Sequence, residues 1–164
     1  MWQQLIVLLG DLTKQYDILL KLAAKKHTAL VSVDFQTVDL VRKAEEKTIA
    51  AIDELEKKRL EVLTALASSD EGSRDISPDI NRRDLYRLAP EEVKKDLLTA
   101  GNELSAKVDA VKEASDNNTL LMKSALQAVT YKLNRLSKTS VDPGYGPGGT
   151  ESVTAHRRSL DFGA

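Results

Sequence analysis

The chain of 164 residues contains no cysteine, and only 4% of its residues are aromatic. The lack of cysteine excludes disulfide bonds and thiolate chemistry. So few aromatic side chains argue against a large globular core and leave Leu, Val, Ile and Ala to supply the apolar surface. The 24 basic and 25 acidic residues give a formal net charge of −1. Because no charge of one sign dominates, nucleic acid and anionic membranes are disfavoured as partners.

Long hydrophobic runs are also missing. The apolar run near the N-terminus is interrupted at Gly10 and Asp11, and no basic residue precedes it. It therefore lacks the form of a signal peptide. No other stretch approaches the roughly 20 apolar residues that a membrane-spanning helix needs. We expect a soluble, cytoplasmic protein without membrane insertion.

What the sequence does contain is helical periodicity, because apolar residues recur at spacings of three and four. The pattern predicts an all-α fold, an elongated antiparallel bundle of three long helices plus a short connecting helix. The bundle is expected to span residues 1–142, with helices at about 2–29, 35–67, 78–88 and 90–137. Asp34 is predicted to cap the second helix, and Ser77 to cap the short one with Pro78 at its first position.

Polar residues interrupt the apolar rows of the first two helices. Lys26 is the one polar member of the first row, and Glu45, Thr48 and Arg59 interrupt the second. Imperfect heptads of this kind favour a globular helical hairpin over a strict two-stranded coiled coil.

The last long helix is expected to be roughly 70 Å long, against about 50 Å for the second. Its C-terminal part is apolar on more than one side, so its stripe can face two neighbouring helices, or one neighbour and a guest. Asn118 falls on the apolar row. A buried polar residue there can fix the helix register; alternatively, Asn117 and Asn118 mark a local end or kink.

A break at Pro143 ends the helical pattern. Two of the four prolines and half of the eight glycines lie within residues 143–149. Helix formation across them is disfavoured, which predicts a Pro/Gly-rich flexible tail over 143–164. Tyr145 in this tail is interpreted either as a lid on the bundle or as an exposed anchor for a partner.

Residues suited to catalysis or to metal and cofactor binding are not apparent. His27 has no second ligand at helical spacing and is expected on a solvated face. The acidic pairs are typical of outer helix faces, and the glycines around Tyr145 lack the strand and the Lys-Ser or Lys-Thr of a phosphate loop. The sequence therefore predicts a binding protein without a cofactor, not an enzyme.

The C-terminal third resembles the FlgN family of cytoplasmic chaperones of flagellar type III export. The resemblance is carried by Asn117-Asn118 before Leu120-Leu121-Met122, by the apolar helix to Leu136, and by Tyr145-Gly146-Pro147-Gly148-Gly149. The series Ser152-Val153-Thr154-Ala155-His156-Arg157 agrees with it. Motif-level similarity covers residues 117–158, and the architecture agrees along essentially the whole chain.

The resemblance implies that the chain binds the hook-filament junction proteins FlgK and FlgL, prevents their premature assembly and delivers them to the export gate. Tyr145 is then expected to contact the gate protein FlhA. The expected client-binding residues are Asn118, Leu121, Met122, Ala125, Leu126, Val129, Leu133, Leu136, Val153, Leu160 and Phe162. The alternative is a self-associating helical scaffold without a client, and a homodimer is compatible with either function.

Overall fold

The computed structural model describes residues 1–69, 72 and 74–139. Within them the chain forms four helices and no strand, which confirms the all-α class: α1 (Trp2–Val31), α2 (Phe35–Ala67), α3 (Arg82–Leu88) and α4 (Glu91–Thr139). The chain divides into two units, residues 1–129 and 130–164. The second unit is described only over 130–139, the end of α4, and the tail predicted for 143–164 lies outside the described residues.

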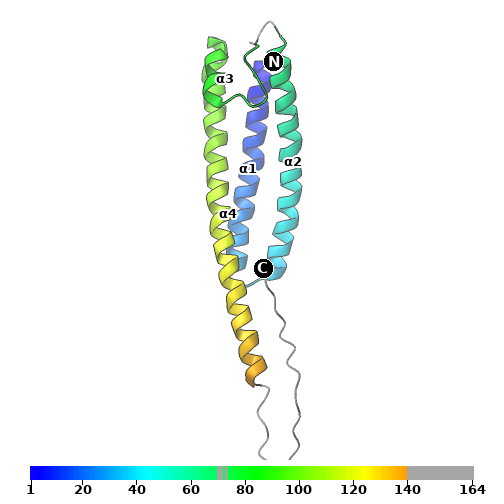
Figure 1. The fold of residues 1–164 in the computed structure, drawn as a ribbon, viewed down its shortest axis with the longest axis vertical. Helices are drawn as coiled ribbons and strands as arrows, with labels where there is room; N and C mark the ends of the chain where they lie inside the picture. Colours follow the sequence, from blue (N-terminus) through cyan, green and yellow to red (C-terminus); the bar gives the residue numbers. More distant parts are fainter. Residues whose placement is uncertain (70–71, 73, 140–164) are drawn as a thin grey trace, which may run out of the picture. The chain divides into compact units, whose positions relative to one another are not determined.

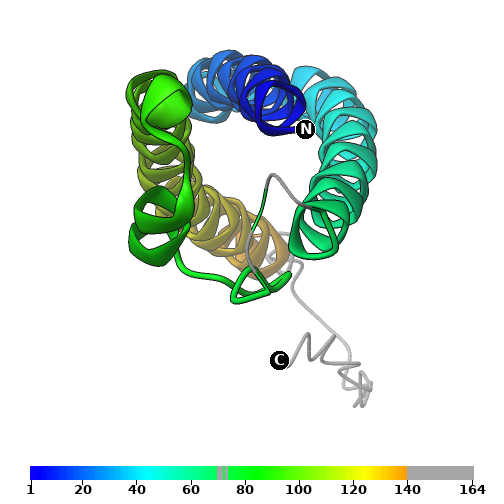
Figure 2. The same cartoon turned by 90° about the horizontal axis from the view of Figure 1, so that it is seen from above.

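In the first unit α1 and α2 form an antiparallel hairpin, and α4 runs in the direction of α1 (Figure 1). Viewed from above, α1 lies between α2 and α4 (Figure 2). This is the predicted antiparallel arrangement of three long helices. The short helix α3 precedes α4 in the chain, and Leu85 places it in the core.

Two groups of buried side chains hold the first unit together. The larger group joins all four helices and the connecting segment at one end: Trp2, Leu5, Leu63, Leu66, Ile76, Leu85, Ala89 and Leu97. The smaller group lies at the turn between α1 and α2 and consists of Ala29, Leu30 and Val38, with Leu121 and Met122 of α4 packed against it. The spacing of buried residues along α1 confirms the predicted apolar row.

The turn between α1 and α2 is fixed by backbone hydrogen bonds. The amide of Asp34 donates to the carbonyl of Ala29 (2.8 Å), and that of Val33 donates to Leu30 (3.2 Å). These are the two bonds of a Schellman motif, whose left-handed position is occupied here by Val33 with φ of 58°. Asp34 then caps α2 as predicted, because its carboxylate accepts from the amide of Thr37 at 3.0 Å.

The start of the short helix was predicted wrongly. It begins at Arg82, not at Pro78, and its cap is Asn81, not Ser77. Ser77 instead accepts from the amide of Ile80 (3.0 Å), which closes a β-turn with Pro78 at its second position. Proline has the same preferred φ at this turn position as at the first position of a helix, so the sequence pattern fits both.

Candidate functional site

The candidate surface lies on α4, which is joined to α1 by two polar contacts. Nζ of Lys107 lies 2.6 Å from Oδ1 of Asp17. Hydrogen bonds from Lys107 and then Lys21 lower the pKa of Asp17 to about 2. Farther along, Nδ2 of Asn118 donates to the carbonyl oxygen of Ala23 at 2.8 Å. These contacts fix which residues of α4 lie opposite which residues of α1.

Asn118 is the buried polar residue that the heptad pattern predicts, with 5% of its surface exposed. Its Oδ1 atom is buried and has no hydrogen-bond partner among the described residues. An unpaired buried acceptor costs roughly 1–3 kcal/mol. The hydrogen bond from Nδ2 therefore fixes the position of α4 on α1, while the unpaired Oδ1 lowers the stability of the fold. The helix continues through Asn117 and Asn118, so the alternative of a helix end at this point is excluded.

Beyond Asn118, the burial of the predicted client-binding residues falls along α4. Leu121 and Met122 are half-buried against the cluster at the α1–α2 turn. Ala125 and Val129 are also half-buried. Leu126 is 55% exposed. These residues of the first unit therefore change from packed to accessible within two turns.

The described end of α4 in the second unit, residues 130–139, carries further exposed apolar side chains. Leu133 and Leu136 are 61% and 66% exposed. Tyr131 is 66% exposed as well and was not among the predicted residues.

Four of the predicted functional residues have no described position. Val153, Leu160 and Phe162, expected to contact the client, and Tyr145, expected to contact the export gate, all lie in 140–164, outside the described residues. Their roles therefore remain predictions.

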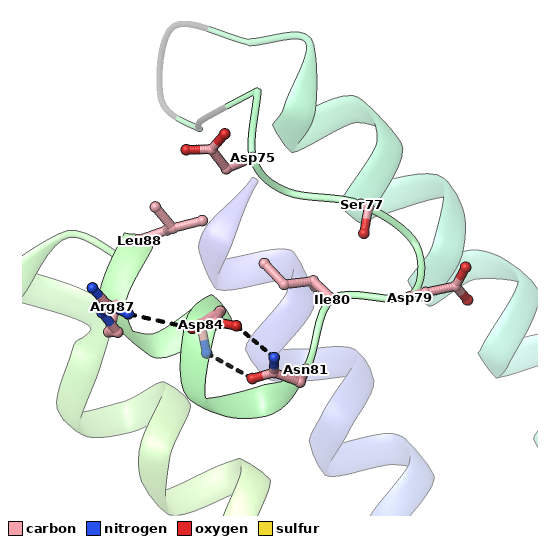
Figure 3. Close-up of a pocket in the computed structure, with 8 residues that line it drawn as sticks. All are labelled: Asp75, Ser77, Asp79, Ile80, Asn81, Asp84, Arg87 and Leu88. Carbon is pink, nitrogen blue, oxygen red and sulfur yellow. Dashed lines mark hydrogen bonds and ion pairs between the residues drawn. The ribbon is translucent and has the colours of Figure 1, made fainter.

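A polar hollow of about 530 Å³ lies beside the start of α3 (Figure 3). Three of its polar side chains, Asn81, Asp84 and Arg87, are engaged with one another. The side-chain oxygen of Asn81 accepts from the amide of Asp84, and Arg87 lies 3.5 Å from the Asp84 carboxylate. These contacts cap α3 and pair two of its charged side chains, so they have a structural role in the helix.

The described residues contain no group of three or more His, Asp or Glu side chains that could hold a metal ion. His27 is exposed, as predicted. In the same residues no helix combines the length and the hydropathy that crossing a membrane requires.

The fold and its longest helix, with exposed apolar residues, define an all-α helical-bundle protein. A family model described as FlgN protein matches residues 1–152. The chain therefore belongs to the FlgN family, which consists of flagellar export chaperones and not of enzymes. The match includes Tyr145 but ends before Val153, Leu160 and Phe162.

Searches of curated proteins found no match to this chain. Searches of solved structures found none either.

Proposed function

We propose that this chain is a cytoplasmic chaperone that binds the amphipathic terminal helices of the hook-associated proteins FlgK and FlgL. In this role it prevents premature assembly and delivers the two clients to the flagellar export gate. The observation that supports client binding is the exposure of Leu126, Leu133 and Leu136 on α4. Family membership supports the export role.

The exposed leucines supply part of the binding energy that a reversible complex needs. Full burial of one leucine side chain stabilises by about 1.5–3 kcal/mol. Since each of the three is more than half exposed, burying all of them contributes on the order of 3–5 kcal/mol before ordering costs. Ala125, Val129 and the further leucine and phenylalanine of residues 150–164 would add to this, which suits a client that has to be released.

Calorimetric titration with peptides spanning the terminal helices of FlgK and FlgL tests the proposal. We expect Leu133→Asp to weaken binding at least tenfold, about 1.4 kcal/mol. Leu120→Asp is the matched control, because Leu120 is 64% exposed but lies on the opposite side of α4. We expect it to bind like the unchanged chain. Absence of binding by the unchanged chain at tens of micromolar would reject the proposed clients.

Delivery is proposed to depend on Tyr145 through contact with FlhA. Tyr145→Ala is expected to retain client affinity and to lose binding to FlhA in a pull-down with the client-loaded chaperone. Tyr145→Phe keeps the ring and serves as the control. Equal loss of client and gate binding in Tyr145→Ala would mean that the residue supports the fold instead.

A further inference from the structure

Two cavities lie in line along the inner side of α1 in the first unit. The first, of about 310 Å³, is lined by Leu19 and Lys26 of α1, Glu45 and Ile49 of α2, and Val111 and Ser115 of α4. The second, of about 450 Å³, is lined by Leu9 of α1, Glu56 and Arg59 of α2, Leu104 and Val108 of α4, and Tyr86 of α3. In both, α1 supplies the floor, and α2 and α4 supply the two walls.

The order of the lining residues places the two cavities one after the other along α1, as two sections of the surface between α2 and α4. From the second section to the first, the floor advances from Leu9 to Lys26, and α2 runs back from Arg59 to Glu45. The α4 wall advances in the same direction as the floor. At 1.5 Å per residue, the floor from Leu9 to Lys26 is about 26 Å long. We call this the α1 groove.

Each section of the α1 groove includes one unsatisfied buried polar atom. Asn118 lines the first section and Tyr86 the second. Their Oδ1 and hydroxyl oxygen are the two buried side-chain polar atoms without a hydrogen-bond partner in the part of the chain that the structure describes. Both atoms are buried within the fold, and the Tyr86 hydroxyl lies close to Gly101 of α4, so neither atom is offered to a partner in the groove.

The charged residues of the groove are largely paired within the wall and floor. Lys26 lies 2.8 Å from Glu45, and Arg59 lies 2.7 Å from Glu56. Ile49 nevertheless remains 49% exposed on the α2 wall. A partner that covers Ile49 therefore meets, in the first section, an apolar surface whose lysine and glutamate are already paired, which favours an uncharged contact stripe there.

We propose that the α1 groove takes an amphipathic helix of the export client, which lies over α1 between α2 and α4 as the fourth helix of a bundle. This inference rests on the proposed function and adds a second contact surface to the exposed stripe of α4. Four-helix bundles bury a shared core between such walls. The guest stripe is about 17 residues long and is uncharged where it crosses the first section.

Substitution of Ile49 tests the groove, with Leu40 as its matched control. Leu40 is also a large exposed side chain of α2, at 60%, but it lies nine positions away and so on the opposite side of the helix. In titrations with the client peptides described above, we expect Ile49→Asp to weaken binding at least tenfold and Leu40→Asp to leave it unchanged. Circular dichroism establishes that both variants fold.

The outcomes separate this inference from the proposed function. No binding by the unchanged chain rejects the proposed clients. Binding that is lost in Leu133→Asp but kept in Ile49→Asp retains the proposed function and overturns the groove. If light scattering shows a dimer that Ile49→Asp dissociates, the groove is occupied by a second copy of the chain, which also overturns the inference.

A second measurement locates the peptide directly. Because the chain has no cysteine, a spin label attached through Ser115→Cys or Glu113→Cys reports from a single place. Both positions are exposed, and they lie on opposite sides of α4, with Ser115 lining the groove. We expect the client peptide to reduce the mobility of the label at 115 only. Equal change at both positions, or change at neither, contradicts the groove.

Discussion

Val33 carries a conformation that its side chain disfavours. At φ of 58° it occupies the left-handed position of the Schellman motif, where glycine is usual. The left-handed region costs an L-residue roughly 1–2 kcal/mol, and β-branching makes it less accessible still. The side chain is 53% exposed, so few packing contacts offset this cost.

Val33→Gly is therefore expected to stabilise the first unit by about 1 kcal/mol. This figure is the strain energy that glycine removes, minus the free-energy cost of glycine's greater conformational entropy in the unfolded chain. Urea denaturation followed by circular dichroism measures the change. Val31→Gly is the control, because Val31 is equally accessible but helical, and glycine there should destabilise by about 1 kcal/mol. The same sign for both variants would contradict the strained conformation.

Single polar residues also show what the sequence predicted and what it did not. Lys26 and Glu45 were recognised as interruptions of two separate apolar rows. The structure brings them within 2.8 Å of each other, with side chains that are 20% and 19% exposed. Asp34 and Asn118 were placed correctly because each acts within a local or heptad pattern. The partner of Lys26 is 19 residues away, and periodicity within one helix carries no information about it.

Between elements, the bond from Lys107 to Asp17 makes the attachment of α4 to α1 dependent on pH. The unfolded pKa of an aspartate is about 3.9, and hydrogen bonds to lysine lower that of Asp17 to about 2 in the folded chain. The unfolded state therefore binds the proton first as the pH falls. The stabilisation is complete above about pH 4 and is lost toward pH 2.

We expect the thermal midpoint to fall less steeply from pH 5 to pH 2 in Asp17→Asn than in the unchanged chain. Asp11→Asn is the control, because Asp11 pairs only with Lys14 on its own helix. A steep fall in both Asp17→Asn and the unchanged chain would show that other carboxylates govern acid unfolding.

The packing of α3 on α4 depends on the missing side chain of Gly101. A Cβ atom at this position would lie 2.0 Å from the hydroxyl oxygen of Tyr86. Arg82 also donates to the Gly101 carbonyl oxygen, at 3.2 Å. Glycine inside a helix costs about 1 kcal/mol relative to alanine, so its presence here follows from the close approach of α3.

Gly101→Ala is expected to displace Tyr86 and to destabilise the chain, in spite of the better helix propensity of alanine. In a Tyr86→Phe background the closest atom is removed, and the same substitution should then stabilise by up to about 1 kcal/mol. Denaturation of the four chains of this double-mutant cycle gives the coupling. Additive effects would mean that Tyr86 does not rest on Gly101.

At the scale of the elements, the helix bounds were largely predictable, and the error at Pro78 has a definite cause. Both a β-turn and a helix start accept proline at that point. The helix begins later because the side chain of Asn81 accepts a hydrogen bond from the Asp84 amide and so caps α3. The α1 groove was not predicted at all. Glu45 and Arg59 were treated as defects of a heptad, although both line that groove, because the position of α4 across α1 from α2 cannot be obtained from either helix alone.

For the whole molecule, exposed leucines fit both a chaperone and a self-associating scaffold, and stability measurements separate the two. A client that binds only the folded chain raises its stability by about 2.7 kcal/mol at a hundredfold excess over the dissociation constant. A scaffold gains stability instead from its own concentration.

We therefore expect the urea midpoint of the chaperone to rise on addition of the client peptide and to be independent of protein concentration without it. Peptides in which the apolar stripe is scrambled provide the control, since they keep composition and charge but cannot form an amphipathic helix. Ile49→Asp should reduce the peptide effect, whereas Leu40→Asp should retain it. A midpoint that rises with protein concentration and ignores the peptide would instead identify the chain as a self-associating scaffold.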